Sequence, residues 1–138
     1  MERPRILVVD DDQYKSICAL LEGKGYDVQG VGSGREALER LKGNEFDLVI
    51  TDLELKTDVA WKMPGIEGTK VMREVKSISP QTRVIVITAH SGLQMAVREM
   101  RPGAFDYIIK GPKFPEMLLE SVGRALGLLP TPSESSEI

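Results

Sequence analysis

The sequence predicts an α/β fold in which five parallel strands form one sheet with helices on both faces. Short apolar runs, such as those at residues 6–9 and 84–87, are typical of strands buried on both faces of a parallel sheet. Segments with apolar side chains at helical spacing alternate with these runs, so that strand and helix follow one another five times. Because right-handed crossovers join parallel strands, this alternation places helices on both faces of the sheet.

The five strands are expected at residues 6–9, 26–31, 47–52, 84–87 and 105–109. Five helices follow them, each identified by apolar side chains three and four positions apart, which would face the core. These side chains are Ile17, Leu20 and Leu21; Ala37, Leu38 and Leu41; Val71, Met72, Val75 and Ile78; Leu93, Ala96, Val97 and Met100; and Met117, Leu118, Val122 and Ala125.

Helix boundaries are marked by capping and breaking residues. Gly23 supplies a stop signal after the first helix, and Pro80 follows the third. Ser33 is an N-cap for the second helix, and Glu36 three residues later completes a capping box. Asp12 is expected to start the first helix rather than to serve a site.

The composition excludes several classes of protein. A chain of 138 residues with 41% hydrophobic and 28% charged residues suits one globular domain. The net charge of −3 gives no electrostatic reason to expect direct binding to nucleic acid or a membrane surface. Cys18 is the single cysteine, so we expect no internal disulfide and interpret it as a small core residue. We find neither a membrane-length apolar run nor a signal peptide, and expect a cytoplasmic protein.

Polar side chains follow four of the five strands at the point where each ends. Residues 10–12 are three aspartates after the first strand, Asp52 ends the third, Thr88 follows the fourth and Lys110 the fifth. This edge is where open α/β sheets bind ligands. If the first and third strands are neighbours, their carboxylates converge and repel unless a cation joins them. Magnesium is the expected ion, because it binds oxygen ligands and needs few carboxylates.

Five motifs occur together and in a fixed order between about residues 5 and 126. They are residues 8–11 (VVDD), 47–52 (DLVITD), 63–68 (MPGIEG), 86–89 (VITA) and 103–110 (GAFDYIIK). In this combination the chain resembles the receiver domain of bacterial two-component response regulators. The resemblance implies a flavodoxin-like, doubly wound sheet with strand order 2-1-3-4-5.

The resemblance also implies roles for individual residues. Asp52 would accept a phosphoryl group from the phosphohistidine of a sensor histidine kinase or phosphotransfer protein. Asp11, Asp52 and the backbone carbonyl of Glu54 would bind Mg²⁺ directly, and Asp10 would act through a bound water. Lys110 would neutralise charge on the phosphoryl oxygens.

Two further residues would form the switch. The Thr88 hydroxyl would bind a phosphoryl oxygen, and Tyr107 would follow it inward, which would change the face formed by the fourth helix and fifth strand. Glu54 and His90, two positions after Asp52 and Thr88, would tune the access of water to the phosphoryl group. The implied protein is a switch that slowly dephosphorylates itself, not an enzyme.

The chain departs from the family pattern at two places. Met63 and Pro64 come late after Asp52, so that residues 55–62 look like an insertion forming a surface loop. In the family a proline follows the lysine, usually across a cis bond, whereas here Gly111 separates Lys110 from Pro112. A cis bond before glycine is costly, so either the bond before Pro112 is cis or neither is.

Other interpretations are open at this point. A phosphatase of the haloacid dehalogenase type also forms an aspartyl-phosphate, although its nucleophile follows the first strand. A degenerate receiver would only bind proteins, and a flavodoxin would need a phosphate-binding loop where the three aspartates stand. Residue by residue, Asp10 and Asp11 could merely cap a helix, and Thr88, Tyr107, His90 and Lys110 could be ordinary strand-end or loop residues.

The domain organisation is expected to be simple. Residues 1–128 would form the receiver domain, and residues 129–138, rich in Pro, Ser and Glu, a flexible tail or the start of a linker. Output would go to a partner protein or an effector domain, with a homodimer through the face of the fourth helix and fifth strand as one option. The residues at positions 88–91 and 103–107 are most similar to those in receivers of enhancer-binding transcription regulators.

Overall fold

A computed structural model describes residues 3–53, 67–89 and 103–129 of the chain. Strands and helices alternate within these ranges, as expected from the spacing of apolar side chains. The elements are β1 (Arg5–Val9), α1 (Tyr14–Glu22), β2 (Asp27–Val31), α2 (Gly34–Leu41), β3 (Leu48–Asp52), α3 (Glu67–Ile78), β4 (Arg83–Thr88), β5 (Asp106–Ile109) and α5 (Phe114–Ala125).

The five strands form one parallel sheet in the order β2-β1-β3-β4-β5, which confirms the predicted order. The register aligns the ends of the central strands. Val9 pairs with Thr51, so that the residues following β1 lie beside Asp52 at the end of β3. On the other side, Asp52 pairs with Ile87, the neighbour of Thr88. The strand ends that carry polar side chains therefore meet at one edge of the sheet.

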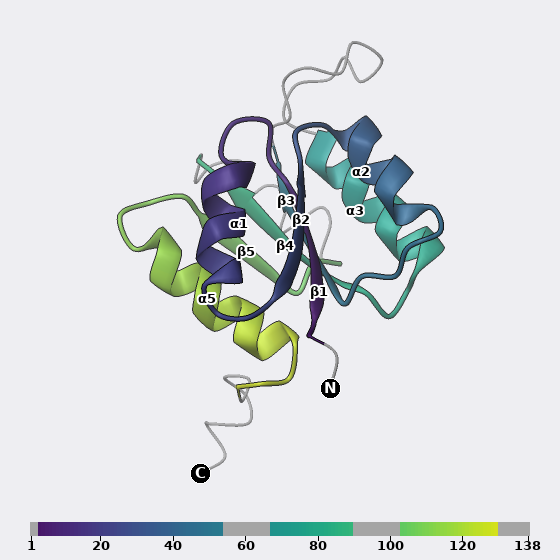
Figure 1. The fold of residues 1–138 in the computed structure, drawn as a ribbon. Coiled ribbons are helices and arrows are strands. Elements are labelled where there is room, and N and C mark those ends of the chain that lie inside the picture. The colour runs from purple at the N-terminus through teal and green to yellow at the C-terminus, as the bar shows by residue number, and fades with distance from the viewer. Residues whose placement is uncertain (1–2, 54–66, 90–102, 130–138) are drawn as a thin grey trace.

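Helices cover both faces of the sheet, with α1 and α5 on one face and α2 and α3 on the other (Figure 1). The side chains of β1 show how the sheet separates two cores. Leu7 and Val9 belong to the cluster that includes Val71 and Val75 of α3. Ile6 and Val8 belong to the cluster on the α1 and α5 side. Alternate side chains of a strand point to opposite faces, so a strand between two helical layers must be apolar throughout.

Helix termini largely follow the sequence signals. Ser33 is the N-cap of α2, and its Oγ accepts a hydrogen bond from the Glu36 N–H at 3.2 Å. Gly23 is the C-cap of α1, and α3 ends at Ile78 just before Ser79 and Pro80. These ends confirm the predicted boundaries to within one or two residues.

Three expectations about individual side chains are wrong. Ile78 and Met117 are 48% and 49% exposed rather than facing the core. Ile78 is the last residue of α3, and α5 packs on the sheet through Leu118, Val122 and Ala125, which leaves Met117 at the flank. Asp12 does not start α1, because Gln13 is its N-cap and makes no side-chain cap.

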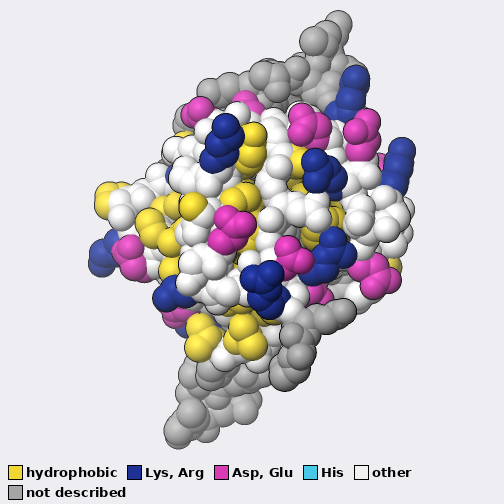
Figure 2. All heavy atoms as spheres, viewed as in Figure 1, with side chains coloured by type: hydrophobic (Ala, Val, Ile, Leu, Met, Phe, Trp, Pro, Cys, Tyr) yellow, Lys and Arg dark blue, Asp and Glu magenta, His cyan; other side chains and the backbone are white. Residues whose placement is uncertain are grey.

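Several predicted features lie outside the described residues. They are the insertion at 55–62, the fourth helix with Leu93, Ala96, Val97 and Met100, and the tail from residue 130. Among the described residues, Figure 2 shows acidic and basic side chains interspersed over one face of the molecule. No helix within the described ranges has the length and hydropathy needed to cross a membrane.

Candidate functional site

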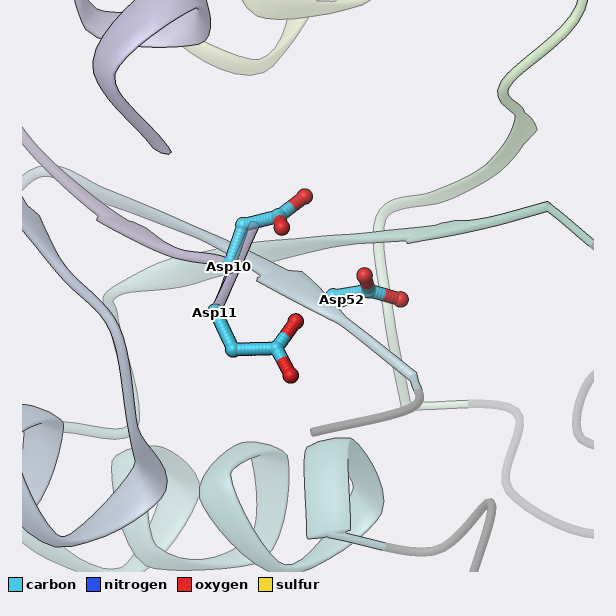
Figure 3. A group of neighbouring side chains, drawn as sticks. All are labelled: Asp10, Asp11 and Asp52. Atoms are coloured by element: carbon cyan, nitrogen blue, oxygen red, sulfur yellow. The ribbon is translucent and has the colours of Figure 1, made fainter. Parts of the chain in front are cut away.

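Three aspartates lie together where β1 and β3 end. Asp10 and Asp11 follow β1, and Asp52 is the last residue of β3. Each offers a carboxylate oxygen, and these three oxygens lie within 4.8 Å of one another. Figure 3 shows the three carboxylates gathered beside the ends of the two strands. Asp10 is fully buried and Asp52 is 6% exposed, while Asp11 is partly exposed. The sheet thus places three acidic groups at one edge, as expected for neighbouring strands.

Lys110 joins two of these carboxylates. Its Nζ lies 2.6 Å from Oδ2 of Asp10 and 2.9 Å from Oδ2 of Asp52. The lysine side chain is only 12% exposed, so the two ion pairs are largely shielded from water. Charge-assisted bonds of this length in a shielded site are among the stronger polar interactions in proteins. Lys110 therefore lies where a cation is needed to hold the aspartates together.

The second oxygen of Asp10 is also in use. Oδ1 accepts hydrogen bonds from the backbone N–H groups of Asp12 and Gln13, both at 2.9 Å. The Asp10 carboxylate therefore secures the turn from β1 into α1, which is close to the capping role that the sequence allows for Asp10 and Asp11. A buried carboxylate is tolerated only when its oxygens are paired, and Asp10 satisfies this with two amides and one ammonium.

The environment of Lys110 changes its pKa in two opposing ways. Burial of the ammonium acts to lower the pKa, whereas the hydrogen bonds and attraction to Asp10 and Asp52 act to raise it. The net result is a pKa above the ordinary lysine value. Lys110 is therefore fully protonated near neutral pH and acts as a fixed positive charge.

Thr88 and Tyr107 lie on the strands next to the aspartates. Thr88 ends β4 and is fully buried, and its backbone carbonyl accepts the N–H of Lys110 at 2.8 Å. Tyr107 is 7% exposed, and its Oη accepts a long hydrogen bond, 3.4 Å, from the Ala104 N–H. The two residues thus lie on adjacent strands at the same side of the site. Glu54 and His90, expected to tune the access of water, lie outside the described residues.

The donor set fits a divalent cation of the magnesium type. Three carboxylates supply hard oxygen ligands, and magnesium in proteins keeps several waters beside one or two carboxylates. Asp10, Asp11 and Asp52 carry three formal negative charges, and Lys110 returns one positive charge. The remaining charge of two equals that of one Mg²⁺ ion.

The opposite edge of the sheet has a different character. An open polar cavity there is lined by equal numbers of arginines and acids, which give it no net charge. These charged residues are Arg3, Arg5, Arg83, Asp27, Glu45 and Asp47. The acidic cluster and its lysine therefore distinguish the edge at the carboxyl ends of the strands.

Comparison with known proteins identifies the family. The sequence model of the response regulator receiver domain matches residues 6–122. The chain belongs to this family. Accepting a phosphoryl group is the general role of its members, so the expected fold and function are confirmed at this level. The dehalogenase-type phosphatase and the flavodoxin are thereby set aside.

Individual relatives agree with this assignment. The transcriptional regulatory protein ZraR of Escherichia coli K12 is 39% identical over 107 residues, which are 76% of this chain and 22% of that protein. A CheY-like receiver domain protein of Methanospirillum hungatei JF-1 is 30% identical with a TM-score of 0.75, covering 91% of this chain and 95% of that one. The response regulator TrrA of Thermotoga maritima, solved in complex with Mg²⁺ and BeF, is 31% identical with a TM-score of 0.73, covering 89% and 99%.

This receiver domain spans about a quarter of the length of the curated relatives that it matches. These relatives are named as transcriptional regulators, which agrees with the similarity of the five motifs to receivers of transcription regulators.

The region after Lys110 corresponds to the second of the two expected alternatives, in which neither bond is cis. All peptide bonds in the described ranges are trans, those before Gly111 and Pro112 included. Lys110 nevertheless reaches both Asp10 and Asp52. The sequence pattern placed Lys110 at the correct edge but carried no signal for its direct contact with Asp10, because that contact depends on the path of a long side chain.

Proposed function

We propose that Asp52 is the phospho-acceptor of this receiver domain. The observation that carries the proposal is the ion pair of 2.9 Å between Asp52 and Lys110, beside the carboxylates of Asp10 and Asp11. An aspartate at this position combines a nucleophilic oxygen with a nearby fixed positive charge. The donor would be the phosphohistidine of a sensor histidine kinase or of a phosphotransfer protein in the cytoplasm.

The reaction transfers one phosphoryl group between two side chains. An Oδ atom of Asp52 attacks phosphorus, and the new O–P bond forms as the N–P bond of the phosphohistidine breaks. The electron pair of that bond returns to the imidazole nitrogen of the donor. Lys110, which now donates to Asp52, would donate to an oxygen of the transferred group and offset its charge.

Asp11, Asp52 and the backbone carbonyl of Glu54 would hold Mg²⁺, and Asp10 would contribute through a bound water. Bound Mg²⁺ supplies positive charge that the carboxylates and the phosphoryl oxygens need in order to approach one another. The burial of Asp10 supports the indirect role, because one of its oxygens already binds two amides and the other binds Lys110.

The switch would act through Thr88 and Tyr107. A phosphoryl oxygen on Asp52 would accept a hydrogen bond from the Thr88 hydroxyl, and the shift of Thr88 would favour the inward position of Tyr107. The changed face of β5 and the expected fourth helix would bind an output partner, an effector domain or a second copy of the chain. Glu54 and His90 would set the rate of slow self-dephosphorylation by controlling access of water.

We also propose that the receiver domain occupies residues 1–128 and that 129–138 form a tail or the start of a linker. The N–H groups of Leu128 and Leu129 both donate to the carbonyl of Gly123, so the chain stays on α5 up to this point.

Intact-mass measurement tests the acceptor. Wild-type protein incubated with acetyl phosphate and Mg²⁺ should gain the mass of one phosphoryl group, and Asp52→Asn should gain none. Asp12→Asn is the matched control, because it removes an exposed carboxylate close to the site and should label normally. A labelled Asp52→Asn protein would assign the acceptor to another residue. An unlabelled wild-type protein would favour a degenerate receiver that only binds partners.

A further inference from the structure

The backbone N–H of Gly111 closes a tight turn around Lys110. It donates to the carbonyl of Ile109, with the nitrogen and oxygen 2.9 Å apart. A bond between residues two positions apart defines a γ-turn, here with Lys110 as the central residue. No non-glycine residue in the described ranges has a positive φ, so this turn is of the inverse kind, which is common where strands end.

The Lys110 side chain must extend across the sheet from β5 to contact Asp10. Lys110 follows β5 at the edge of the sheet, and β4 and β3 lie between β5 and β1, which precedes Asp10. Adjacent strands are about 4.8 Å apart, so the strand axes of β5 and β1 are separated by roughly 14 Å. The Lys110 side chain alone is shorter than this span, so it contacts Asp10 only if it leaves the backbone toward β1 and the Asp10 side chain covers the remainder.

The backbone of Lys110 is fixed on both sides. Its own N–H donates to the carbonyl of Thr88 at 2.8 Å, which extends the pairing of β5 with β4. The next N–H, that of Gly111, donates back to Ile109. Between them these two bonds define the direction in which the Lys110 side chain leaves the sheet.

We propose that Gly111 is a positioning residue whose backbone N–H aims Lys110 at Asp10 and Asp52, and hence at the phosphoryl group. This inference rests on the function proposed for Asp52. A proline at this position has no N–H to donate and disfavours compact backbone conformations in the residue before it. In this chain the N–H of Gly111 holds the turn at Lys110 by a hydrogen bond. The proline of a Lys-Pro sequence has no N–H and cannot donate this bond.

The turn depends on the backbone N–H of residue 111 and not on its side chain. The φ of Gly111 is outside the left-handed region, and a Cβ built there would meet no atom of residues 3–53, 67–89 or 103–129 within 4 Å. Alanine therefore fits and keeps the N–H. The Gly111 carbonyl accepts the N–H of Phe114 at 3.0 Å and would remain in both the alanine and the proline variant. The pair Gly111→Ala and Gly111→Pro thus separates the effect of a side chain at position 111 from loss of the turn, because proline removes the N–H and also disfavours the compact conformation of Lys110.

Labelling kinetics with acetyl phosphate and Mg²⁺ test the role. Gly111→Ala should label at the wild-type rate, whereas Gly111→Pro should label roughly tenfold more slowly, because small misplacements of a reacting group are costly. When Lys110→Ala is already present, adding Gly111→Pro should not lower the labelling rate further. A further decrease would mean that the proline acts through a general disturbance of the site and not through the position of Lys110. Thermal unfolding should show that both Gly111 variants are folded.

A second measurement needs no variant. Hydrogen exchange of the Gly111 amide in wild-type protein should be roughly tenfold slower than in an unstructured chain, although the residue is exposed. If the Gly111 amide exchanges as fast as in an unstructured chain, the inference is overturned. This measurement decides whether the turn exists even if Gly111→Pro does not fold. Equal labelling of wild type and Gly111→Pro would overturn the inference too. Absence of labelling in wild type would instead contradict the proposed function, and the exchange result would still decide whether the turn exists.

Discussion

The Nζ atom of Lys110 lies 2.6 Å from Oδ2 of Asp10, a residue one hundred positions earlier in the chain. This ion pair joins the end of the outer strand β5 to the end of β1. Asp10 is fully buried, and an unpaired buried carboxylate would be strongly unfavourable. The same ammonium also pairs with Asp52, so it offsets the repulsion between two neighbouring acids. Lys110 therefore supports the fold before any phosphoryl group arrives.

Replacing Lys110 should lower the stability of the metal-free domain. Lys110→Ala leaves Asp10 and Asp52 without their shared cation, and breaking a buried pair by removing one partner costs about 3 kcal/mol. Urea unfolding in the presence of a chelator measures the change. Lys113→Ala removes an exposed lysine three positions later and should leave stability nearly unchanged. Equal stability of the Lys110 variant and the wild type would show that the ion pairs contribute nothing to the fold.

Magnesium should reduce that difference. A divalent cation among Asp10, Asp11 and Asp52 would take over the charge compensation that Lys110 provides, so Lys110→Ala should gain more stability from Mg²⁺ than the wild type does. Unfolding curves at a series of Mg²⁺ concentrations give both responses. The same gain in the two proteins would indicate that Lys110 and the ion act independently.

The raised pKa of Lys110 predicts how its stabilising effect depends on pH. A lysine whose pKa is higher in the folded state than its ordinary 10.5 stabilises the fold fully below that value. The effect is lost as pH rises through the folded-state pKa. The stability difference between wild type and Lys110→Ala should therefore be constant up to about pH 10 and shrink above it. A difference that already decreases between neutral pH and pH 9 would contradict the raised pKa.

The fold and the location of the site could be predicted from local patterns. Strands that are apolar throughout must lie between two helical layers, and parallel strands bring their carboxyl ends to one edge. That β1 and β3 are neighbours, which places Asp10 beside Asp52, followed from the family resemblance and not from these patterns. Long-range side-chain contacts could not be predicted in the same way. The pairing of Lys110 with Asp10 and the bonds from Asp12 and Gln13 to Asp10 depend on details of backbone direction. No residue pattern marks such details.

Gly30 should be intolerant of any larger side chain. A Cβ at this position of β2 would lie 2.6 Å from Cδ1 of Tyr14 and 2.7 Å from Sγ of Cys18, both on α1. Those distances force α1 or its side chains to shift, and overpacking of this kind costs about 1–3 kcal/mol. We therefore expect Gly30→Ala to lower the midpoint of thermal unfolding by several degrees.

The control for Gly30 is Gly103→Ala, because a Cβ at Gly103 would meet no atom of the described residues within 4 Å and should be harmless. Adding Cys18→Ala to Gly30→Ala removes one of the two clashes and should recover part of the lost stability. Strictly additive effects of the two substitutions would argue that Cys18 does not press against Gly30.

Cys18 should be a poorly reactive thiol. Partial burial, and to a lesser extent the negative charge of Glu22, raise its pKa from 9.0 to about 11. Two pKa units reduce the reactive thiolate about 100-fold near pH 8, so alkylation by iodoacetamide should be slower by that factor than in urea-unfolded protein. The rate should rise with pH and level off only above about 11. The thiol of the unfolded chain ionises at a lower pH than the thiol of the folded chain. The stability that the protonated Cys18 thiol contributes to the folded state should therefore be lost as pH rises from 9.0 to about 11.

Two variants separate the causes of this raised pKa. Glu22→Gln removes the nearby charge but leaves the thiol where it is, so the pKa of Cys18 should fall by the smaller part of the shift. Cys18→Ser should abolish alkylation, because the chain has no other cysteine, and should remove the change in stability above pH 9.0. A wild-type rate that levels off near pH 9.0 would mean that the thiol reacts from an open position rather than from its packed position beside Gly30.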